Sequence, residues 1–157
     1  VVVMDMSADR LAFARARMGV ADTLHARGGA DDVAAVADLT GGRMAEVVVD
    51  ATGSAASMAA ALALAGFGGR LVYVGITQGE IVFPHAPVMH RRELTLLASR
   101  NALSRNFNRI IGLIEAERID KRQWLTHHVP FADTIRAFPG FLEPASGVIK
   151  AVVEMPA

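Results

Sequence analysis

Apolar residues in this chain form short unbroken runs joined by segments of helix-forming residues. The run at 46–51 contains three consecutive valines without polar alternation, which is typical of a parallel strand covered on both faces. The segment at 54–65 is rich in Ala, Leu and Met, begins with a serine and is followed by a glycine, so it predicts a helix. A second apolar run at 70–75 completes a β-α-β unit. Right-handed crossovers bring both strand ends to one edge of the sheet, where ligands of open α/β sheets bind.

The same pattern predicts further strands and helices on both sides of this unit. Ser7 can cap a helix that ends at Gly19, and another helix, closed by Gly41 and Gly42, is expected over 31–39. The glycine-rich residues 66–69 predict a turn, and the prolines at 84 and 87 should prevent regular structure. Additional strands are expected at residues 1–4, 23–25 and 94–98. The predicted class is α/β, with a Rossmann-like doubly wound parallel sheet.

The last third of the chain has a different pattern. A helix capped by Ser104 is expected, because apolar residues recur there at helical spacing: Phe107, Ile110, Ile111 and Ile114. A shorter helix over 133–138 should end or kink at Pro139, and a strand over 147–154 closes the chain. We therefore predict a partial dinucleotide-binding domain over residues 1–125. A C-terminal helix-strand return follows over residues 126–157.

The chain opens within an apolar run, Val1 to Met4, and not with Met, so we expect it to be a fragment. In the doubly wound strand order 3-2-1-4-5-6, the strand that carries the glycine fingerprint lies between the strands expected at 1–4 and 46–51. No run in this sequence supplies it. We predict either a gap of roughly 10 Å between those two strands or a rearranged pairing that closes the gap.

Composition narrows the class of partner. The 157 residues are 52% hydrophobic and 20% charged, with 16 basic and 16 acidic residues and no cysteine. Formal neutrality gives no reason to expect nucleic acid or anionic lipid as a partner. The absence of cysteine excludes disulfides and thiolate metal sites within the chain, and the longest apolar run is much shorter than the ~20 residues that span a bilayer. We expect a soluble, cytoplasmic protein.

Candidate chemistry is concentrated at Asp5, at the end of the first expected strand. A carboxylate there can accept hydrogen bonds from the ribose hydroxyls of a dinucleotide, and its charge would repel a 2′-phosphate, which favours NAD over NADP. The alternative, that Asp5 only stabilises a turn, stays open. Arg10, one turn along the helix, can reach the same ribose or face water. The fingerprint G-x-G-x-x-G itself is absent, because residues 66–69 precede a strand and do not open a helix.

Other polar residues carry weaker signals. His127 and His128 are adjacent, so strand alternation points their rings to opposite sides, which disfavours a metal site. A solvated basic edge is the preferred interpretation of His85, His90 and the two arginines that follow. Neither Ser54 nor Ser57 has the partners of a hydrolase triad. We assign no catalytic and no metal-binding residue within the chain.

Taken together, five stretches resemble the medium-chain dehydrogenase/reductase family, in particular its zinc-type alcohol and polyol dehydrogenases. They occur in the order of the family and are spread along nearly the whole chain: residues 1–11, 49–53, 68–76, 94–101 and 147–153. The sequence Ala-Ser-Arg-Asn at 98–101 most resembles the corresponding segment of the dehydrogenases of sugar acids and polyols, such as the idonate, galactonate and sorbitol enzymes.

The resemblance implies a function and a set of site residues. It implies hydride transfer between an alcohol, polyol or sugar acid and NAD, in a homodimeric or homotetrameric protein. Zinc would be bound by residues absent from this chain, so the fragment alone should be inactive. The residues implied to bind the cofactor are Asp5 and Arg10 at the adenosine ribose, Ala51, Thr52 and Gly53 beside the dinucleotide, Val74, Gly75 and Ile76 at the nicotinamide carboxamide, and Ser99 and Arg100 near the nicotinamide.

Three alternatives remain open. A zinc-free quinone or enoyl reductase of the same superfamily would use NADPH, which Asp5 disfavours. A non-catalytic α/β binding module would hold no dinucleotide at the carboxyl edge of its sheet. A methyltransferase-like fold would bind S-adenosylmethionine through Asp5, but the segments at 74–75 and 99–100 fit it poorly.

Overall fold

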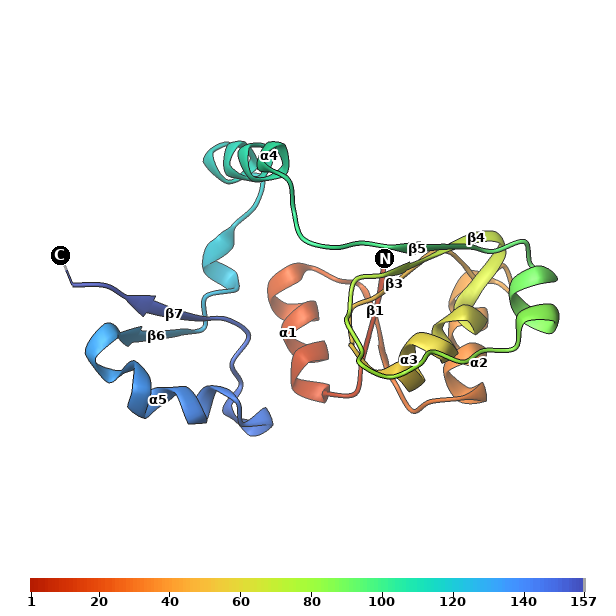
Figure 1. Ribbon diagram of the computed structural model, residues 1–157, viewed down its shortest axis with the longest axis horizontal. Coiled ribbons are helices and arrows are strands. Elements are labelled where there is room, and N and C mark those ends of the chain that lie inside the picture. Colours follow the sequence, from red (N-terminus) through yellow and green to blue (C-terminus); the bar gives the residue numbers. More distant parts are fainter. Residues whose placement is uncertain (157) are drawn as a thin grey trace. The chain divides into compact units, whose positions relative to one another are not determined.

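The computed structural model describes residues 1–156, in which short parallel strands alternate with helices (Figure 1). The predicted α/β class is therefore confirmed. The helices and strands are, in chain order, β1 (Val2–Asp5), α1 (Ala8–Met18), β2 (Asp22–His25), α2 (Ala30–Thr40), β3 (Ala45–Asp50), α3 (Ala55–Ala60), η1 (Ala61–Leu64), β4 (Ala65–Tyr73), η2 (His85–His90), β5 (Thr95–Ala98), α4 (Ser104–Glu115), η3 (Lys121–Gln123), β6 (His127–Pro130), η4 (Phe131–Asp133), α5 (Thr134–Phe141), η5 (Pro144–Ser146) and β7 (Ala151–Glu154).

These elements belong to two compact units. The first unit contains residues Val1–Leu11 and Asp22–Asn101, and the second contains Ala12–Ala21 and the described residues from Ala102 on. In the first unit β1 pairs with β2, and β3, β4 and β5 form a second sheet; β6 pairs with β7 in the second unit, and every pairing is parallel. The predicted end of the dinucleotide-binding domain at residue 125 stays a prediction, because compactness does not define where a nucleotide-binding domain ends.

The two sheets of the first unit are separate. Within residues 1–156, neither β1 nor β2 pairs with β3, and no further strand is hydrogen-bonded between them. Of the two predicted outcomes, the rearranged pairing is therefore not found. A parallel sheet that is interrupted at this point leaves the edge of β3 without a partner strand, which is the position where the sequence predicted a missing neighbour.

The core of the first unit lies between the β3-β4-β5 sheet and the helical segment formed by α3 and η1. Its buried side chains are Met58, Ala61, Leu62, Ala65, Leu71, Tyr73 and Leu94, and Val48 packs against them. The opposite face of β3 is open, since Val47 and Val49 are 45% and 60% exposed. The prediction that this strand is covered on both faces is therefore wrong for the described residues, because α3 and η1 cover only one face.

Several predicted element ends are confirmed by their caps. Ser7 Oγ accepts a hydrogen bond from Arg10 N at 3.3 Å, and Ser54 Oγ accepts one from Ser57 N at 3.4 Å. Gly41 ends α2 in the left-handed conformation. The helix predicted over 54–65 is shorter than expected and tightens into the 3-10 helix η1 before β4 begins.

The predicted turn at residues 66–69 is wrong, because these residues belong to β4. Ala65 pairs with Ala45, and the next pair is Arg70 with Val47. β4 thus spans five positions where β3 spans two, and the extra residues form a bulge. Glycines in a strand commonly mark such a bulge, so the glycine cluster was a signal of strand irregularity and not of a turn.

The prolines at 84 and 87 do not prevent regular structure. Pro84 precedes the short helix η2, and Pro87 lies in its first turn, where a missing N–H costs no hydrogen bond. Arg92, which follows this helix, is also not part of a solvated edge. Its Nη1 donates to Ala63 O at 2.9 Å and to Ala65 O at 2.7 Å, so it caps carbonyl groups at the end of η1.

Three expectations for the second unit need correction. Ser104 is the first residue of α4 and does not cap it; the preceding Leu103 accepts the first hydrogen bond with its carbonyl, from Asn106 N at 2.8 Å. Pro139 neither ends nor limits α5, which continues to Phe141. A proline there removes one hydrogen bond, close to the helix end, so little helix is lost. The last strand begins at Ala151 and not at residue 147.

Tyr73 offers a test of the core of the first unit. Its hydroxyl donates to Met58 O at 2.6 Å, and burial, followed by the nearby charge of Asp50, raises the pKa of Tyr73 above its usual value of 10.0. Because the pKa of Tyr73 is higher in the folded than in the unfolded state, its neutral phenol stabilises the folded state. This contribution to the free energy of unfolding is complete below about pH 10 and is lost as the pH rises through the folded-state pKa. We expect Tyr73→Phe to lower the free energy of unfolding by about 1 kcal/mol at pH 7. Denaturation of the wild type and of Tyr73→Phe at pH 7 and above pH 10 measures this difference in the free energy of unfolding. A difference that does not shrink at high pH would contradict the prediction.

Candidate functional site

Eight of the predicted cofactor-binding residues lie at the carboxyl edge of the β3-β4-β5 sheet, here called the sheet rim. They follow the three strands in order: Ala51, Thr52 and Gly53 after β3, Val74, Gly75 and Ile76 after β4, and Ser99 and Arg100 after β5. The backbone joins these loops. Val74 N and Gly75 N donate to Asp50 O at 2.8 and 3.0 Å, and Ser99 N donates to Tyr73 O at 2.8 Å. Parallel pairing thus brings together residues that are far apart in sequence.

The loops after β3 and β4 approach each other closely. A Cβ atom on Gly75 would lie 2.4 Å from Gly53 N, and one on Gly53 would lie 3.0 Å from Ile76 O. Gly53 also has a φ of +69°, which favours glycine. Main chain meets main chain at this point, so the sheet rim presents backbone groups where other residues would place side chains. Close approach of two backbone segments is a common reason for glycine at such positions.

Asp5 and Arg10 lie together at the carboxyl end of β1. Asp5 Oδ1 accepts a hydrogen bond from Ser7 N at 2.8 Å, while Oδ2 lies 3.9 Å from Arg10 Nη1. The Asp5 side chain is 32% exposed and that of Arg10 is 63% exposed. Both interpretations made from the sequence fit this geometry, because the carboxylate stabilises a turn through one oxygen and retains lone pairs for hydroxyl donors on the other.

Sequence reasoning missed His25 at the same edge. His25 is the register partner of Asp5 in the parallel β1-β2 pair, and its Nε2 lies 2.8 Å from Met6 O. Because a carbonyl only accepts, Nε2 must carry the proton in this contact. His25 therefore holds the segment that directly follows Asp5. A polar residue ending the strand next to Asp5 was the only available signal.

Sequence reasoning also missed Asp50, the last residue of β3, which is only 5% exposed. Its Oδ1 accepts from Thr52 N at 2.9 Å and from Thr52 Oγ1 at 2.8 Å, and its Oδ2 accepts from Ser57 Oγ at 2.8 Å. The carboxylate thus connects the end of β3, the loop after it and the first turns of α3. An acidic residue at the end of an apolar run, followed by two hydroxyl residues, was the signal in the sequence.

The two adjacent histidines of β6 have different neighbours, as strand alternation predicts. His128 Nδ1 lies 2.9 Å from Glu154 Oε1, whereas the His127 ring centroid lies 6.2 Å from that of Phe141. Among residues 1–156, no three His, Cys, Asp or Glu side chains are grouped so that they could hold a metal ion.

None of the helices in residues 1–156 is long and apolar enough to cross a membrane.

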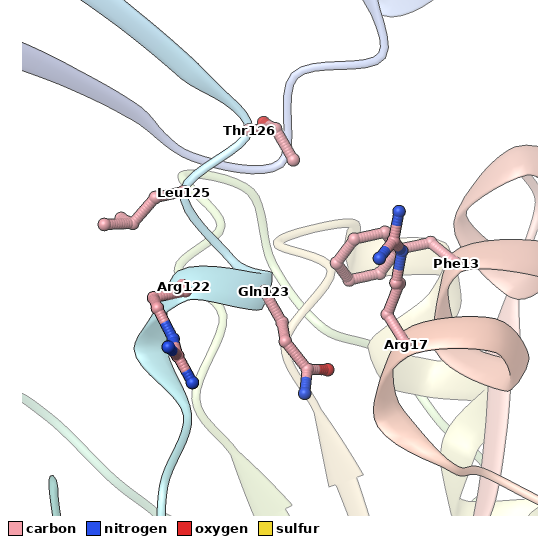
Figure 2. A pocket seen from close by; sticks show the side chains of 6 residues that line it. All are labelled: Phe13, Arg17, Arg122, Gln123, Leu125 and Thr126. Carbon is pink, nitrogen blue, oxygen red and sulfur yellow. The ribbon is translucent and has the colours of Figure 1, made fainter.

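The second unit contains a hollow of about 360 Å³ (Figure 2). Phe13 and Arg17 line it from α1, and the remaining lining residues come from the segment that leads into β6: Arg122, Gln123, Leu125 and Thr126. Arg122 Nε donates to Asp120 Oδ1 at 2.8 Å, and hydrogen bonds from Arg122 hold the pKa of Asp120 below its usual value. None of the predicted site residues lines this hollow.

Comparison with known proteins identifies the family. Residues 1–116 match the family described as zinc-binding dehydrogenase. The chain belongs to this family. The predicted resemblance to zinc-type dehydrogenases is thereby confirmed, and the sheet rim lies within the matched residues.

The curated relatives include dehydrogenases named for L-galactonate and L-arabinitol. L-galactonate-5-dehydrogenase of Escherichia coli is 34% identical over 113 residues, which are 72% of this chain and 33% of that protein. L-arabinitol 4-dehydrogenase of Hypocrea jecorina is 32% identical over 156 residues, which are 98% of this chain and 41% of that protein. The chain therefore spans less than half the length of these two relatives.

Solved structures agree with the fold. An oxidoreductase/dehydrogenase of unknown specificity from Escherichia coli matches with a TM-score of 0.88 at 24% identity, over 99% of this chain and 44% of that one. The alcohol dehydrogenase of Aeropyrum pernix matches with a TM-score of 0.80 at 27% identity, over 98% of this chain and 42% of that one. Both units of the chain thus have counterparts in known dehydrogenases.

Proposed function

We propose that this chain forms the nucleotide-binding part of a zinc-dependent oxidoreductase that transfers hydride between NAD and an alcohol, polyol or sugar acid. The observation that carries the proposal is the contact between the Gly53 and Gly75 loops at the sheet rim. It supports a backbone-lined place for the nicotinamide at the edge of a parallel sheet, where α/β proteins bind such ligands. Membership of the zinc-binding dehydrogenase family supports the reaction class.

In this proposal the residues of the chain bind and orient the cofactor. Asp5 accepts hydrogen bonds from the adenosine ribose hydroxyls and disfavours a 2′-phosphate by repulsion, and Arg10 flanks the same sugar. Around the nicotinamide, Val74, Gly75 and Ile76 offer backbone groups to the carboxamide. Beside them lie Ala51, Thr52 and Gly53 from one loop and Ser99 and Arg100 from another.

The metal is assigned to residues outside this chain. A zinc ion bound beside the substrate would polarise the alcohol oxygen so that hydride can leave. The chain has no cysteine, and residues 1–156 hold no group of candidate ligands, so the donor set does not fit zinc here. The contribution of the chain is confined to holding the nucleotide.

For the substrate we propose a polyol or a sugar acid. The support is the names of the relatives, which include dehydrogenases of L-galactonate and L-arabinitol and a D-xylulose reductase. We also propose that the parent protein is a cytoplasmic homodimer or homotetramer.

The experiment that tests this function uses the full-length protein. Simple alcohols, pentitols, hexitols and aldonic acids are offered with NAD⁺ or NADP⁺, and absorbance at 340 nm is followed before and after metal chelation. We expect reduction of NAD⁺ in preference to NADP⁺ with at least one polyol or sugar acid, loss of activity on chelation, and recovery with added Zn²⁺. NADPH-dependent quinone reduction that survives chelation would instead identify the zinc-free alternative.

A further inference from the structure

Asp50 is a buried carboxylate whose hydrogen-bond donors among the described residues are all neutral. Its two oxygens accept hydrogen bonds from the backbone N–H of Thr52 and from the hydroxyls of Thr52 and Ser57, at 2.8 to 2.9 Å. None of these donors carries a charge. The side chain is held at the end of β3, immediately before the loop that contacts Gly75. A carboxylate fixed by hydrogen bonds therefore directly precedes the residues of the sheet rim.

The charge of Asp50 acts on a neighbouring titratable group. Asp50 is one of the two causes that raise the pKa of Tyr73, after burial of the phenol itself. Tyr73 is the register partner of Asp50 in the β3-β4 pair. A charge that opposes ionisation of a neighbouring group is not neutralised by its hydrogen bonds, and it acts through a medium of lower polarity than water.

We infer that the charge of Asp50 makes the sheet rim prefer the oxidised nicotinamide. The inference rests on the proposed function and deepens it. The nicotinamide ring of NAD⁺ carries a positive charge that NADH lacks, while the rest of the two molecules is identical. A fixed carboxylate near the ring therefore stabilises bound NAD⁺ relative to bound NADH.

Two substitutions separate the charge of Asp50 from its role in holding the loop. Asp50→Asn keeps an acceptor for Thr52 and a side chain of the same shape, because the amide can donate to Ser57 Oγ, but it removes the charge. Ser57→Ala is the matched control, since it removes a hydrogen bond to the same carboxylate and leaves the charge. Dissociation constants of NAD⁺ and NADH are measured for the full-length proteins by calorimetry and by NADH fluorescence, with thermal unfolding as a check of folding.

We expect Asp50→Asn to raise the ratio of the NAD⁺ to the NADH dissociation constant on the order of fivefold, because the substitution removes the Coulomb attraction to the cationic ring. Ser57→Ala should leave this ratio unchanged. If Asp50→Asn does not fold, Ser57→Lys carries the test, because an ammonium beside the intact carboxylate should move the ratio in the same direction.

Two different results would refute the inference or the proposed function. Equal weakening of both nucleotides by Asp50→Asn, with the ratio preserved, would overturn the inference and leave Asp50 with a purely structural role. Failure of the wild-type protein to bind either nucleotide would instead refute the proposed function. The two failures are thus distinguishable in a single set of titrations.

Discussion

Replacing Gly75 with alanine should weaken NADH binding by the full-length protein tenfold or more. The new Cβ would lie 2.4 Å from Gly53 N and 3.0 Å from Gly53 Cα, a separation that real Cβ atoms do not adopt. Both neighbouring atoms belong to the backbone, so no side chain can rotate away and the loops after β3 and β4 must move apart. Overpacking of this kind typically costs about 1–3 kcal/mol, and the displaced loops carry most of the residues proposed to contact the nicotinamide.

The matched control is Gly79→Ala. Gly79 lies in the loop that follows β4, and a Cβ there would come no closer than 3.9 Å to Thr77 Oγ1. Titration by NADH fluorescence and thermal unfolding of both variants therefore distinguishes a local steric effect from a general effect of glycine replacement. Unchanged NADH affinity in Gly75→Ala would show that the contact between the two loops does not shape the nucleotide site.

Asp5→Ala should reduce NADH affinity by about one to two orders of magnitude. A hydrogen bond to a charged group contributes about 1.5–3 kcal/mol, and about 1.4 kcal/mol corresponds to a tenfold change in affinity. The substitution also removes the acceptor of Ser7 N, whose donor distance to Oδ1 is 2.8 Å. Asp5→Asn separates the two effects, because it keeps an acceptor for Ser7 and removes only the charge.

The charge of Asp5 leads to a second prediction, on the choice between NADH and NADPH. Asp5→Asn should narrow the difference between NADH and NADPH affinity, since a 2′-phosphate is no longer repelled. Asp9→Asn is the control, because this residue lies in the exposed first turn of α1 and should leave both affinities unchanged. If Asp5→Asn keeps the wild-type preference, another group sets the specificity and the assignment of Asp5 to the ribose is wrong.

Local pattern was sufficient to predict most strands and helices of this chain. Unbroken apolar runs located the strands, and cap residues such as Ser7 and Gly41 located helix ends, because both signals act over a few neighbouring residues. The sheet rim was predictable for a related reason. Once two strands are parallel, the residues that follow them must meet at the same edge.

Features that depend on contacts between distant segments were missed. The bulge in β4 depends on its register against β3, and the helix η2 forms although Pro84 and Pro87 flank or enter it. Asp50 was overlooked because its burial follows from the packing of α3 on the sheet. The amphipathic pattern of α4 correctly predicted a helix, but Phe107 is 59% exposed, so the pattern did not reveal what covers that face.

Titration of the full-length wild-type protein with NADH and with NADPH, followed by nucleotide fluorescence, tests the NAD site most directly. We expect saturable fluorescence enhancement with NADH and much weaker binding of NADPH, because Asp5 accepts the ribose hydroxyls and repels a 2′-phosphate. Absence of binding by either nucleotide, or tighter binding of NADPH, would contradict the claim that the sheet rim and Asp5 form an NAD site.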